Sequence, residues 1–365
     1  MLLIYTENTN NTRLCYVLDF ILKESLDLHY LLTNDKEQFK QSNKIKICYA
    51  SENIDSKALF IKKQGLLDKD AIIIPKNLQI HRWKHSTILF YNQPGKEMPF
   101  DIFSAVFFLI SRMEEYVLKT AVDKHNRFDY SKSIAAKYGF LEEPIIDIWI
   151  LHFKFLLEKI GGKAIPQNKA KILTTFDIDI INKFQYLPKY KVCFRKFYYL
   201  LKGQSKKLKQ LKNIRKRKEI DSYEAIWEEL NIKKDEKYLC FILLSKGHKF
   251  DTNVPLSKFD YLTWIRKNGK YFNFQIHPSY RGHYDFNAWK KEKDILEDFA
   301  EKTIQKSRFH FIKYEIHKDY NHLINLGIKE DFSMAYGNKN GYRASTARSF
   351  YWFDLIENKK TELKV

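Results

Sequence analysis

Short apolar segments alternate with longer segments of helical periodicity in the second half of the chain, and this order restricts the fold more than any other feature. The strand-like segments are KILTTFDIDI (171–180), KYLCFILLSK (237–246), YFNFQIHPSY (271–280), RFHFIKYEI (308–316) and DFSMAYG (331–337). The helical segments between them are 223–230, 258–267, 285–306 and 319–326. Strands that alternate with helices form a parallel sheet with helices outside it. We therefore expect an α/β domain, built either as a barrel or as a doubly wound sheet.

The first 165 residues predict a separate, small domain of mixed α/β type. MLLIY reads as a first strand, and the segments that follow it alternate in type. Helices are expected at 14–22, 100–116 and 144–160, and strands at 46–49, 59–62 and 71–74. The last helix should stop at Gly161-Gly162, because glycine is a common helix terminator. The stretch GGKAIPQNK is the expected boundary, so the predicted domains are 1–165 and 168–365.

Composition excludes several classes of protein. Apolar residues make up 44% of the chain, which is enough for a packed core. The longest strongly apolar run, 103–110, is far shorter than the roughly 20 residues of a membrane-spanning helix. The four cysteines are scattered without a CxxC pair, which argues against a disulfide framework or a thiolate zinc site. With no basic segment at the N-terminus to indicate a signal peptide, we expect a cytoplasmic protein.

Positive charge is concentrated in one segment, which we treat as a basic insertion at 189–218. It contains thirteen Lys and Arg residues and no Asp or Glu, in a chain whose formal net charge is +20. Aromatic residues and leucines are interleaved with the basic ones. Such a segment is either a solvated helical excursion or a surface for an anionic membrane or a polyanion. Nucleic acid is the least favoured of these partners, because no recognised nucleic-acid-binding motif accompanies the segment.

Chemistry in a parallel α/β domain gathers at the carboxyl ends of the strands, so the residues at these positions are the first candidates. Asp177 and Asp179 end the first strand of the second domain, and His277 ends the third. Two carboxylates on one face of a strand repel each other unless a cation, an arginine or a shared proton compensates. One can then ligate a divalent metal while the other acts as a base; the alternative is a helix cap beside a surface aspartate. His277 is a suitable ligand for zinc or another transition metal, although many histidines at such positions are structural.

Three further residues are candidates of lower rank. Arg308 could hold a carboxylate in bidentate geometry and so orient a base, or it could form an ordinary surface ion pair. His310 lies on the same face of the expected strand as Arg308 and is a weaker catalytic candidate. His283, six residues after His277, is a weak candidate for a further metal ligand.

Four segments carry a resemblance to a known family: TTFDIDI, IHPSY, SRFHF and EDFSMAYGNKNGYRASTARSFYWFDL, in this order. They resemble the polysaccharide deacetylase family, carbohydrate esterase family 4. The most similar branch is common in Bacteroidetes-type bacteria and carries a similar N-terminal domain, with segments like DIFSAVFFLISRMEEY and FLEEPIIDIW. The resemblance covers nearly the whole chain. It implies a deformed (β/α) barrel and metal-dependent hydrolysis of N-acetyl or O-acetyl groups on a sugar or polysaccharide.

The resemblance also implies roles for single residues. Asp177 stands where the family has its catalytic base, Asp179 near a metal-binding aspartate, His277 at the first metal-binding histidine, and Arg308 at the arginine that positions the base. At the family's second metal-binding histidine this sequence has Arg281.

The C-terminal part departs from the family as well. The family has a late histidine as general acid, but no histidine follows His322, so the sequence assigns no general acid. The chain is expected to end at the opening of a strand, which would leave the barrel incomplete. Apolar residues such as Tyr351, Trp352 and Phe353 would then be partly uncovered, and the isolated chain poorly soluble or oligomeric.

Three functions therefore remain open at the level of the sequence. The first is a divalent-metal-dependent hydrolase, with zinc the expected ion, that acts on an acetylated sugar or polysaccharide. The second is a catalytically degenerate glycan-binding protein on the same fold. The third is a binder of a polyanion or an anionic membrane surface through residues 189–218, which would place the protein at the periphery of the inner membrane.

Overall fold

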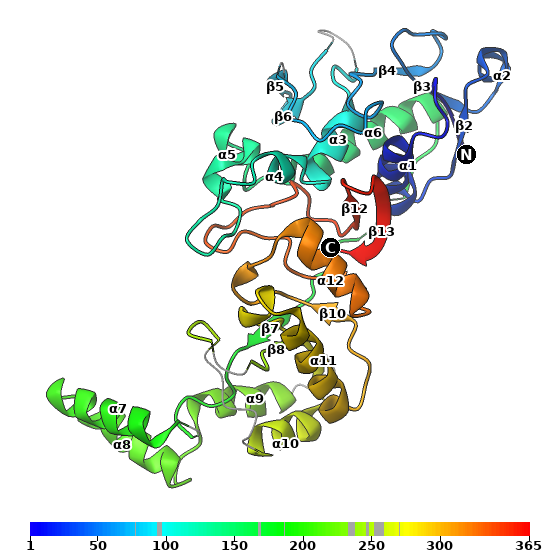
Figure 1. The fold of residues 1–365 in the computed structure, drawn as a ribbon. Helices are drawn as coiled ribbons and strands as arrows, with labels where there is room; N and C mark the ends of the chain where they lie inside the picture. Colours follow the sequence, from blue (N-terminus) through cyan, green and yellow to red (C-terminus); the bar gives the residue numbers. More distant parts are fainter. Residues whose placement is uncertain are drawn as a thin grey trace. The chain divides into compact units, whose positions relative to one another are not determined.

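The computed structural model covers residues 1–365 and groups them into two compact units (Figure 1). It describes all residues except Asn77, 93–96, 167–168, Tyr186, 233–237, 246–247, 252–258 and Lys270. The first unit contains Met1–Ala170, Glu315–Ile324 and Lys329–Val365, and the second contains Lys171–Tyr314 and Asn325–Ile328. Residues 315–324 and 329–365, which the sequence analysis assigned to the second domain, thus group with the first unit. Some ends of the expected elements and domains lie outside the described residues, namely Asn168, Lys237, Lys246 and Lys258.

The first unit contains a parallel sheet in the order β2-β1-β3-β4. Its strands are β1 (Leu2–Tyr5), β2 (Tyr30–Thr33), β3 (Ile45–Ala50) and β4 (Leu59–Lys62), and an antiparallel pair, β5 (Ile80–Trp83) and β6 (Ser86–Leu89), follows. The strand expected at 71–74 is wrong. These residues are exposed or half-buried, and the carbonyl of Ala71 accepts a hydrogen bond from Arg13 (3.1 Å) instead of pairing with a neighbouring strand.

The helices of the first unit are α1 (Thr12–Leu18), continued by the π-helix η1 (Asp19–Ser25), α2 (Lys36–Gln41), α3 (Ile102–Ile110), α4 (Met113–Val117), the 3₁₀ turn η2 (Tyr130–Lys132), α5 (Ile134–Lys137), α6 (Ile145–Gly161) and α12 (Ile316–Asn325). All of them except α2 and α12 pack on one large apolar core. The helix expected over 100–116 is interrupted at Arg112, whose left-handed backbone (φ 55°) separates α3 from α4. The stop at the end of α6 is confirmed, since Gly162 adopts a left-handed conformation (φ 62°).

Helix α3 explains the longest apolar run of the sequence. All nine of its residues are buried, as expected for a helix that is apolar on every side. Its N-terminus is capped by the buried Asp101, which accepts hydrogen bonds from the backbone N–H of Ser104 (3.0 Å) and from the hydroxyl of Tyr49 (3.1 Å). The run therefore forms protein core. Within the described residues, no helix combines the length and the apolar character needed to cross a bilayer.

The C-terminal strands belong to the first unit and are better covered than expected. Strand β13 (Lys359–Lys364) pairs in parallel with β11 (Glu330–Asp331) and antiparallel with β12 (Tyr351–Asp354). Trp352 and Phe353, which were expected to be partly uncovered, are 1% and 0% exposed. The expectation is wrong for these two because the ring of Phe353 packs on those of Tyr16 (4.9 Å) and Phe107 (5.1 Å), and that of Trp352 packs on Tyr320 (5.3 Å).

The second unit confirms the alternation of strands and helices. Its strands run parallel in the order β10-β9-β8-β7, with β7 (Thr175–Ile178), β8 (Leu239–Ile242), β9 (Asn273–Ile276) and β10 (Lys306–Ser307). The helices are α7 (Lys189–Leu201), α8 (Ser205–Arg215), α9 (Ser222–Ile232), α10 (Phe259–Asn268) and α11 (Phe286–Ala300), with 3₁₀ turns η3 (Arg281–His283) and η4 (His310–Ile312). The molecule is thus of mixed α/β type with parallel sheets, and the described strands do not form a closed barrel.

The strand expected over 308–316 is wrong. Strand β10 ends at Ser307, and the chain turns at η4, where Phe311 and Ile312 both have left-handed backbone angles (φ 63° and 51°) that no strand can include. The backbone N–H of His310 donates to the carbonyl of Pro278 (3.1 Å), which holds this turn against the segment after β9.

Four charged residues form a buried ion network in the first unit. The guanidinium of Arg112 donates to Glu114 (2.7 Å) and Glu115 (2.8 Å), and that of Arg343 donates to both carboxylate oxygens of Glu115 (2.9 and 2.5 Å). All four side chains are at most 7% exposed. Burial would raise the pKa of Glu115, but the two guanidinium groups lower it below its ordinary value. The network joins the α3–α4 segment to the distant segment around residue 343.

Removal of one member should leave a buried charge only partly compensated. We expect Arg343→Met to reduce the free energy of unfolding by about 3–5 kcal/mol, because Glu115 keeps a single guanidinium partner in a buried site. Urea unfolding measures the loss. Lys339→Met removes a surface ion pair with Glu142 and should leave the urea midpoint unchanged. Equal effects of the two substitutions would contradict a structural role for the network.

Candidate metal centre

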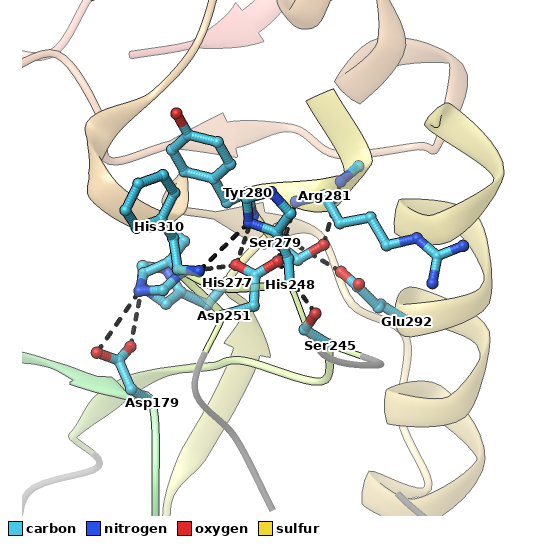
Figure 2. Close-up of polar contacts among 12 residues, drawn as sticks. Asp179, Ser245, His248, Asp251, His277, Ser279, Tyr280, Arg281, Glu292 and His310 are labelled. Carbon is cyan, nitrogen blue, oxygen red and sulfur yellow. Dashed lines mark hydrogen bonds and ion pairs between the residues drawn. The ribbon is translucent and has the colours of Figure 1, made fainter. Parts of the chain in front are cut away.

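Three potential metal ligands come together at the carboxyl ends of the strands of the second unit. Asp179 follows β7, His277 follows β9, and His310 opens the turn after β10. Their ligand atoms all lie within 4.8 Å of one another (Figure 2). The Nε2 atoms of His277 and His310 lie 3.4 and 3.6 Å from the carboxylate oxygens of Asp179. Asp179 and His277, the two residues that the resemblance places at the metal, thus lie together in the structure.

Both imidazole rings are held through the nitrogen that faces away from Asp179. Nδ1 of His277 lies within hydrogen-bond distance of the backbone carbonyl of Arg308, and Nδ1 of His310 is 3.0 Å from a carboxylate oxygen of Asp251. A carbonyl or an ionised carboxylate can only accept, so each Nδ1 carries the proton. Each Nε2 faces Asp179 and would offer its lone pair to a bound ion, which is the arrangement found around metal-binding histidines.

The carboxylate of Asp251 is itself fixed from several sides. It is 1% exposed and accepts hydrogen bonds from the backbone N–H groups of Tyr280 (2.8 Å) and Arg281 (3.0 Å) and from the hydroxyl of Ser245 (3.1 Å). Burial would raise its pKa, but these donors and His310 lower it below the ordinary value. The group therefore stays ionised and orients the His310 ring (Figure 2).

The donor set fits a divalent transition metal. Burial would raise the pKa of Asp179, but the two histidines lower it well below its usual range, and the carboxylates of Asp179 and Asp251 raise the pKa of His310 to about 9 despite its burial. The Oδ1 atom of Asp179 is shielded from solvent and has no hydrogen-bond partner among the described residues. Ligands about 2.1 Å from a tetrahedral zinc ion lie about 3.4 Å apart, close to the distances observed here. One carboxylate and two imidazoles match the three protein ligands of catalytic zinc sites.

Arg308 connects the triad to Asp177. Its guanidinium donates to Asp177 Oδ1 (3.0 Å) and to the hydroxyl of Thr175 (2.9 Å), and it lies 4.7 Å over the ring of Phe241. The expected contact with a carboxylate is therefore present, but it is not bidentate, because the second nitrogen is used by Thr175. Since the carbonyl of Arg308 also faces His277, one residue orients both groups.

The remaining candidates from the sequence occupy different positions. His310, predicted as a catalytic residue, is brought to Asp179 and His277 as a third potential ligand. Arg281, at the position of the family's second histidine, pairs with Asp285 (3.5 Å), and its side chain points away from the triad (Figure 2). His283 is not part of the triad. Sequence reasoning missed Asp251, although its place after β8, at the same edge of the sheet, was a usable signal.

Comparison with known proteins adds little at the site. Residues 2–161 match a family of unknown function, DUF7033, which lies within the first unit. No curated protein and no solved structure matches the chain. The candidate metal centre therefore has to be interpreted from its own geometry.

A buried carboxyl group next to the centre should make stability depend on pH. Glu292 on α11 is 4% exposed, and burial raises its pKa from near 4.5 to about 7, despite a hydrogen bond from the backbone N–H of Ser279. The folded state then binds a proton that the unfolded state releases between pH 4.5 and 7, so this group lowers stability as pH rises through that window.

We expect Glu292→Gln to remove this dependence, because glutamine stays neutral and can still accept from Ser279. The variant should gain up to about 3 kcal/mol in free energy of unfolding over the wild type at pH 8, and little at pH 4. Urea unfolding at several pH values measures the difference. Asp298→Asn, an exposed change on the same helix, should leave the pH dependence as it is. A constant difference between Glu292→Gln and wild type at every pH would contradict the assignment.

Asp251 should matter for metal binding without being a ligand. In Asp251→Asn the partner of His310 Nδ1 is no longer an ionised acceptor, so we expect the affinity for zinc to fall by about 10–100-fold. Competition with a metal indicator measures the affinity. Asp285→Asn, on the surface near Arg281, is the matched control and should bind zinc like the wild type. Unchanged affinity in Asp251→Asn would rule out this supporting role.

Proposed function

We propose that the chain is a divalent-metal-dependent hydrolase that removes acetyl groups from a sugar or polysaccharide. Its second unit would then be the core of a deformed (β/α) barrel of the polysaccharide deacetylase type. The observation that carries the proposal is the combination of two sites at one edge of the sheet. These are the triad of Asp179, His277 and His310, and the separate carboxylate of Asp177 held by Arg308.

The residues divide into two tasks. Asp179, His277 and His310 would hold the ion, and two imidazoles with one carboxylate favour zinc. When bound, such an ion acidifies water and polarises the acyl carbonyl. Asp177 is the proposed general base: it takes a proton from the attacking water as the water oxygen bonds to the acetyl carbon. The bond from that carbon to the sugar nitrogen or oxygen then breaks, and the leaving atom takes up a proton, which gives acetate and the free amine or hydroxyl. Arg308 is a positioning residue that keeps the Asp177 carboxylate in place.

Aromatic rings beside His310 support a sugar as the substrate. The rings of Phe250, Tyr280 and Phe311 pack on one another with centroids 4.8–5.8 Å apart, and Phe311 lies 4.8 Å from the His310 ring. Tyr284 adds a ring that is 71% exposed and lies 6.2 Å from Tyr280. The apolar C–H faces of sugar rings pack well on such aromatic surfaces.

The state of the four cysteines supports a reducing compartment. Cys15, Cys48, Cys193 and Cys240 are all free thiols, as is usual for proteins of the cytoplasm. We therefore keep the cytoplasm as the proposed location.

One alternative on the same fold is a glycan-binding protein without catalysis. Its support is that none of the described residues is assigned as general acid. Its weakness is His310, which lies next to Asp179 and offers the second imidazole that the sequence lacks at Arg281.

Metal analysis of the purified chain, combined with acetate release from acetylated sugars, tests the proposal. We expect wild type to hold one zinc ion, and His277→Ala or His310→Ala to lose it. Asp177→Asn should keep the metal but lose roughly 10²–10⁴-fold in the rate of acetate release, because the base is gone. His85→Ala, an exposed histidine of the first unit, is the control and should behave as wild type.

Two results would change the assignment. Loss of metal together with activity in Asp177→Asn would make Asp177 a ligand. Metal binding without acetate release from any acetylated sugar would favour the glycan-binding alternative.

A further inference from the structure

Helices α7 and α8 form a hairpin within the second unit that the proposed hydrolysis does not use (Figure 1). The hairpin has its own small core, made by Phe184, Val192, Leu211 and Ile214. Arg215 secures its base by donating to the backbone carbonyls of Gln185 (2.6 Å) and Leu187 (3.0 Å). The hairpin is therefore a folded element with a defined inner and outer face.

The outer face of α7 is apolar. Five large side chains follow one another at the spacing i, i+4, i+7, i+8 and i+11, which places them on one side of a helix. They are Tyr190, Phe194, Phe197, Tyr198 and Leu201, and each is between 44% and 70% exposed. Val192 and Tyr199, which face the hairpin core, lie on the opposite side. We call the five exposed residues the α7 stripe. Exposed apolar surface of this kind marks an interaction site.

Positive charge borders the α7 stripe. On α7, Lys191 lies beside it, whereas Lys189 and Lys196 lie further round the helix, on the side of Val192. Helix α8 adds four exposed lysines, Lys206, Lys207, Lys209 and Lys212, and no acidic residue occurs between 189 and 218. The partner of this surface must therefore be anionic as well as apolar.

A basic cleft lies between the two helices. It has a volume of about 360 Å³ and is lined by Val192, Cys193 and five cationic residues, Lys189, Lys196, Lys212, Arg215 and Lys216. An anionic group of the size of a phosphate is the chemistry that such a lining recognises.

We propose that the α7–α8 hairpin binds the anionic surface of a lipid membrane. The α7 stripe lies in the boundary between headgroups and acyl chains, where aromatic side chains are favoured. The flanking lysines and the basic cleft contact lipid phosphates. A double-stranded nucleic acid or an anionic polysaccharide would contact the lysines but leave Phe194, Phe197 and Leu201 in water, whereas a bilayer surface accepts both features. The inference stands independently of the proposed hydrolysis.

Sedimentation of the full chain with lipid vesicles tests the proposal. The vesicles contain phosphatidylcholine alone, or phosphatidylcholine mixed with phosphatidylglycerol. We expect binding to the mixed vesicles only, weakened as salt rises from about 0.1 M to about 0.5 M. Phe194→Ser with Phe197→Ser should weaken it by about tenfold or more at the lower salt, and Lys191→Glu with Lys196→Glu should weaken it at least as much.

Matched controls come from other exposed helix surfaces. Phe155→Ser removes a phenylalanine that is 61% exposed on α6, and Lys290→Glu with Lys291→Glu reverses two exposed charges on α11. Both should bind vesicles like the wild type. Because all substituted residues are exposed, circular dichroism and zinc content should stay unchanged. Phe194→Trp provides a second readout: its emission should shift to the blue with the anionic vesicles.

Several results would overturn the proposal. These are absence of binding to anionic vesicles, binding that the phenylalanine substitutions do not weaken, and an unshifted Phe194→Trp emission. Binding to heparin or DNA in place of vesicles, lost only in the lysine variant, would identify a polyanion site instead. A dimer that the phenylalanine variant converts to a monomer, without vesicle binding, would identify a contact between two copies.

Discussion

The buried carboxylate of Asp251 is the group on which the candidate metal centre depends. It connects the segments that follow three strands, because it lies after β8, accepts from the backbone of Tyr280 and Arg281 after β9, and faces His310 after β10. Loss of one of the four hydrogen bonds to this carboxylate would cost folding free energy, since a buried charge has to be compensated. The orientation of the His310 ring therefore follows from the packing of the whole strand edge. The same holds for His277, whose ring is fixed by a main-chain carbonyl.

Much of the fold could be predicted from the sequence, and the failures share a physical cause. Strands β8 and β9 were found because a strand covered on both faces is apolar along its length, and such runs are easy to recognise. Strand β7 was found from the short apolar run that leads into it. The end of β10 and the break before α4 were missed because they depend on left-handed residues that are not glycine, Phe311 and Arg112. Such conformations are imposed by tertiary contacts, here the buried ion network at Arg112 and the hydrogen bond from the backbone of His310 to Pro278, and the local sequence carries no sign of them.

The candidate site was predicted in part for a related reason. Asp179 and His277 were found because each comes directly after a recognisable strand. His310 was expected on a strand, and its alternation with Arg308 there suggested a catalytic role. The strand ends before His310, and the turn that follows brings the residue to the two other potential ligands. Asp251 acts through hydrogen bonds to backbone groups far away in the sequence, and no spacing rule reports such contacts. Neither the sequence nor the described part of the structure assigns a general acid.

Arg308 positions both the proposed metal ligand His277 and the proposed base Asp177, but through different groups. Its main-chain carbonyl orients the His277 ring, and this contact does not require any particular side chain at the position. Its guanidinium orients Asp177, which only an arginine can do while also reaching the hydroxyl of Thr175. The position of the proposed base thus depends on the identity of residue 308, whereas the position of the proposed ligand depends only on the path of its backbone. A change of side chain here would separate base orientation from metal binding, although both arise from the same residue.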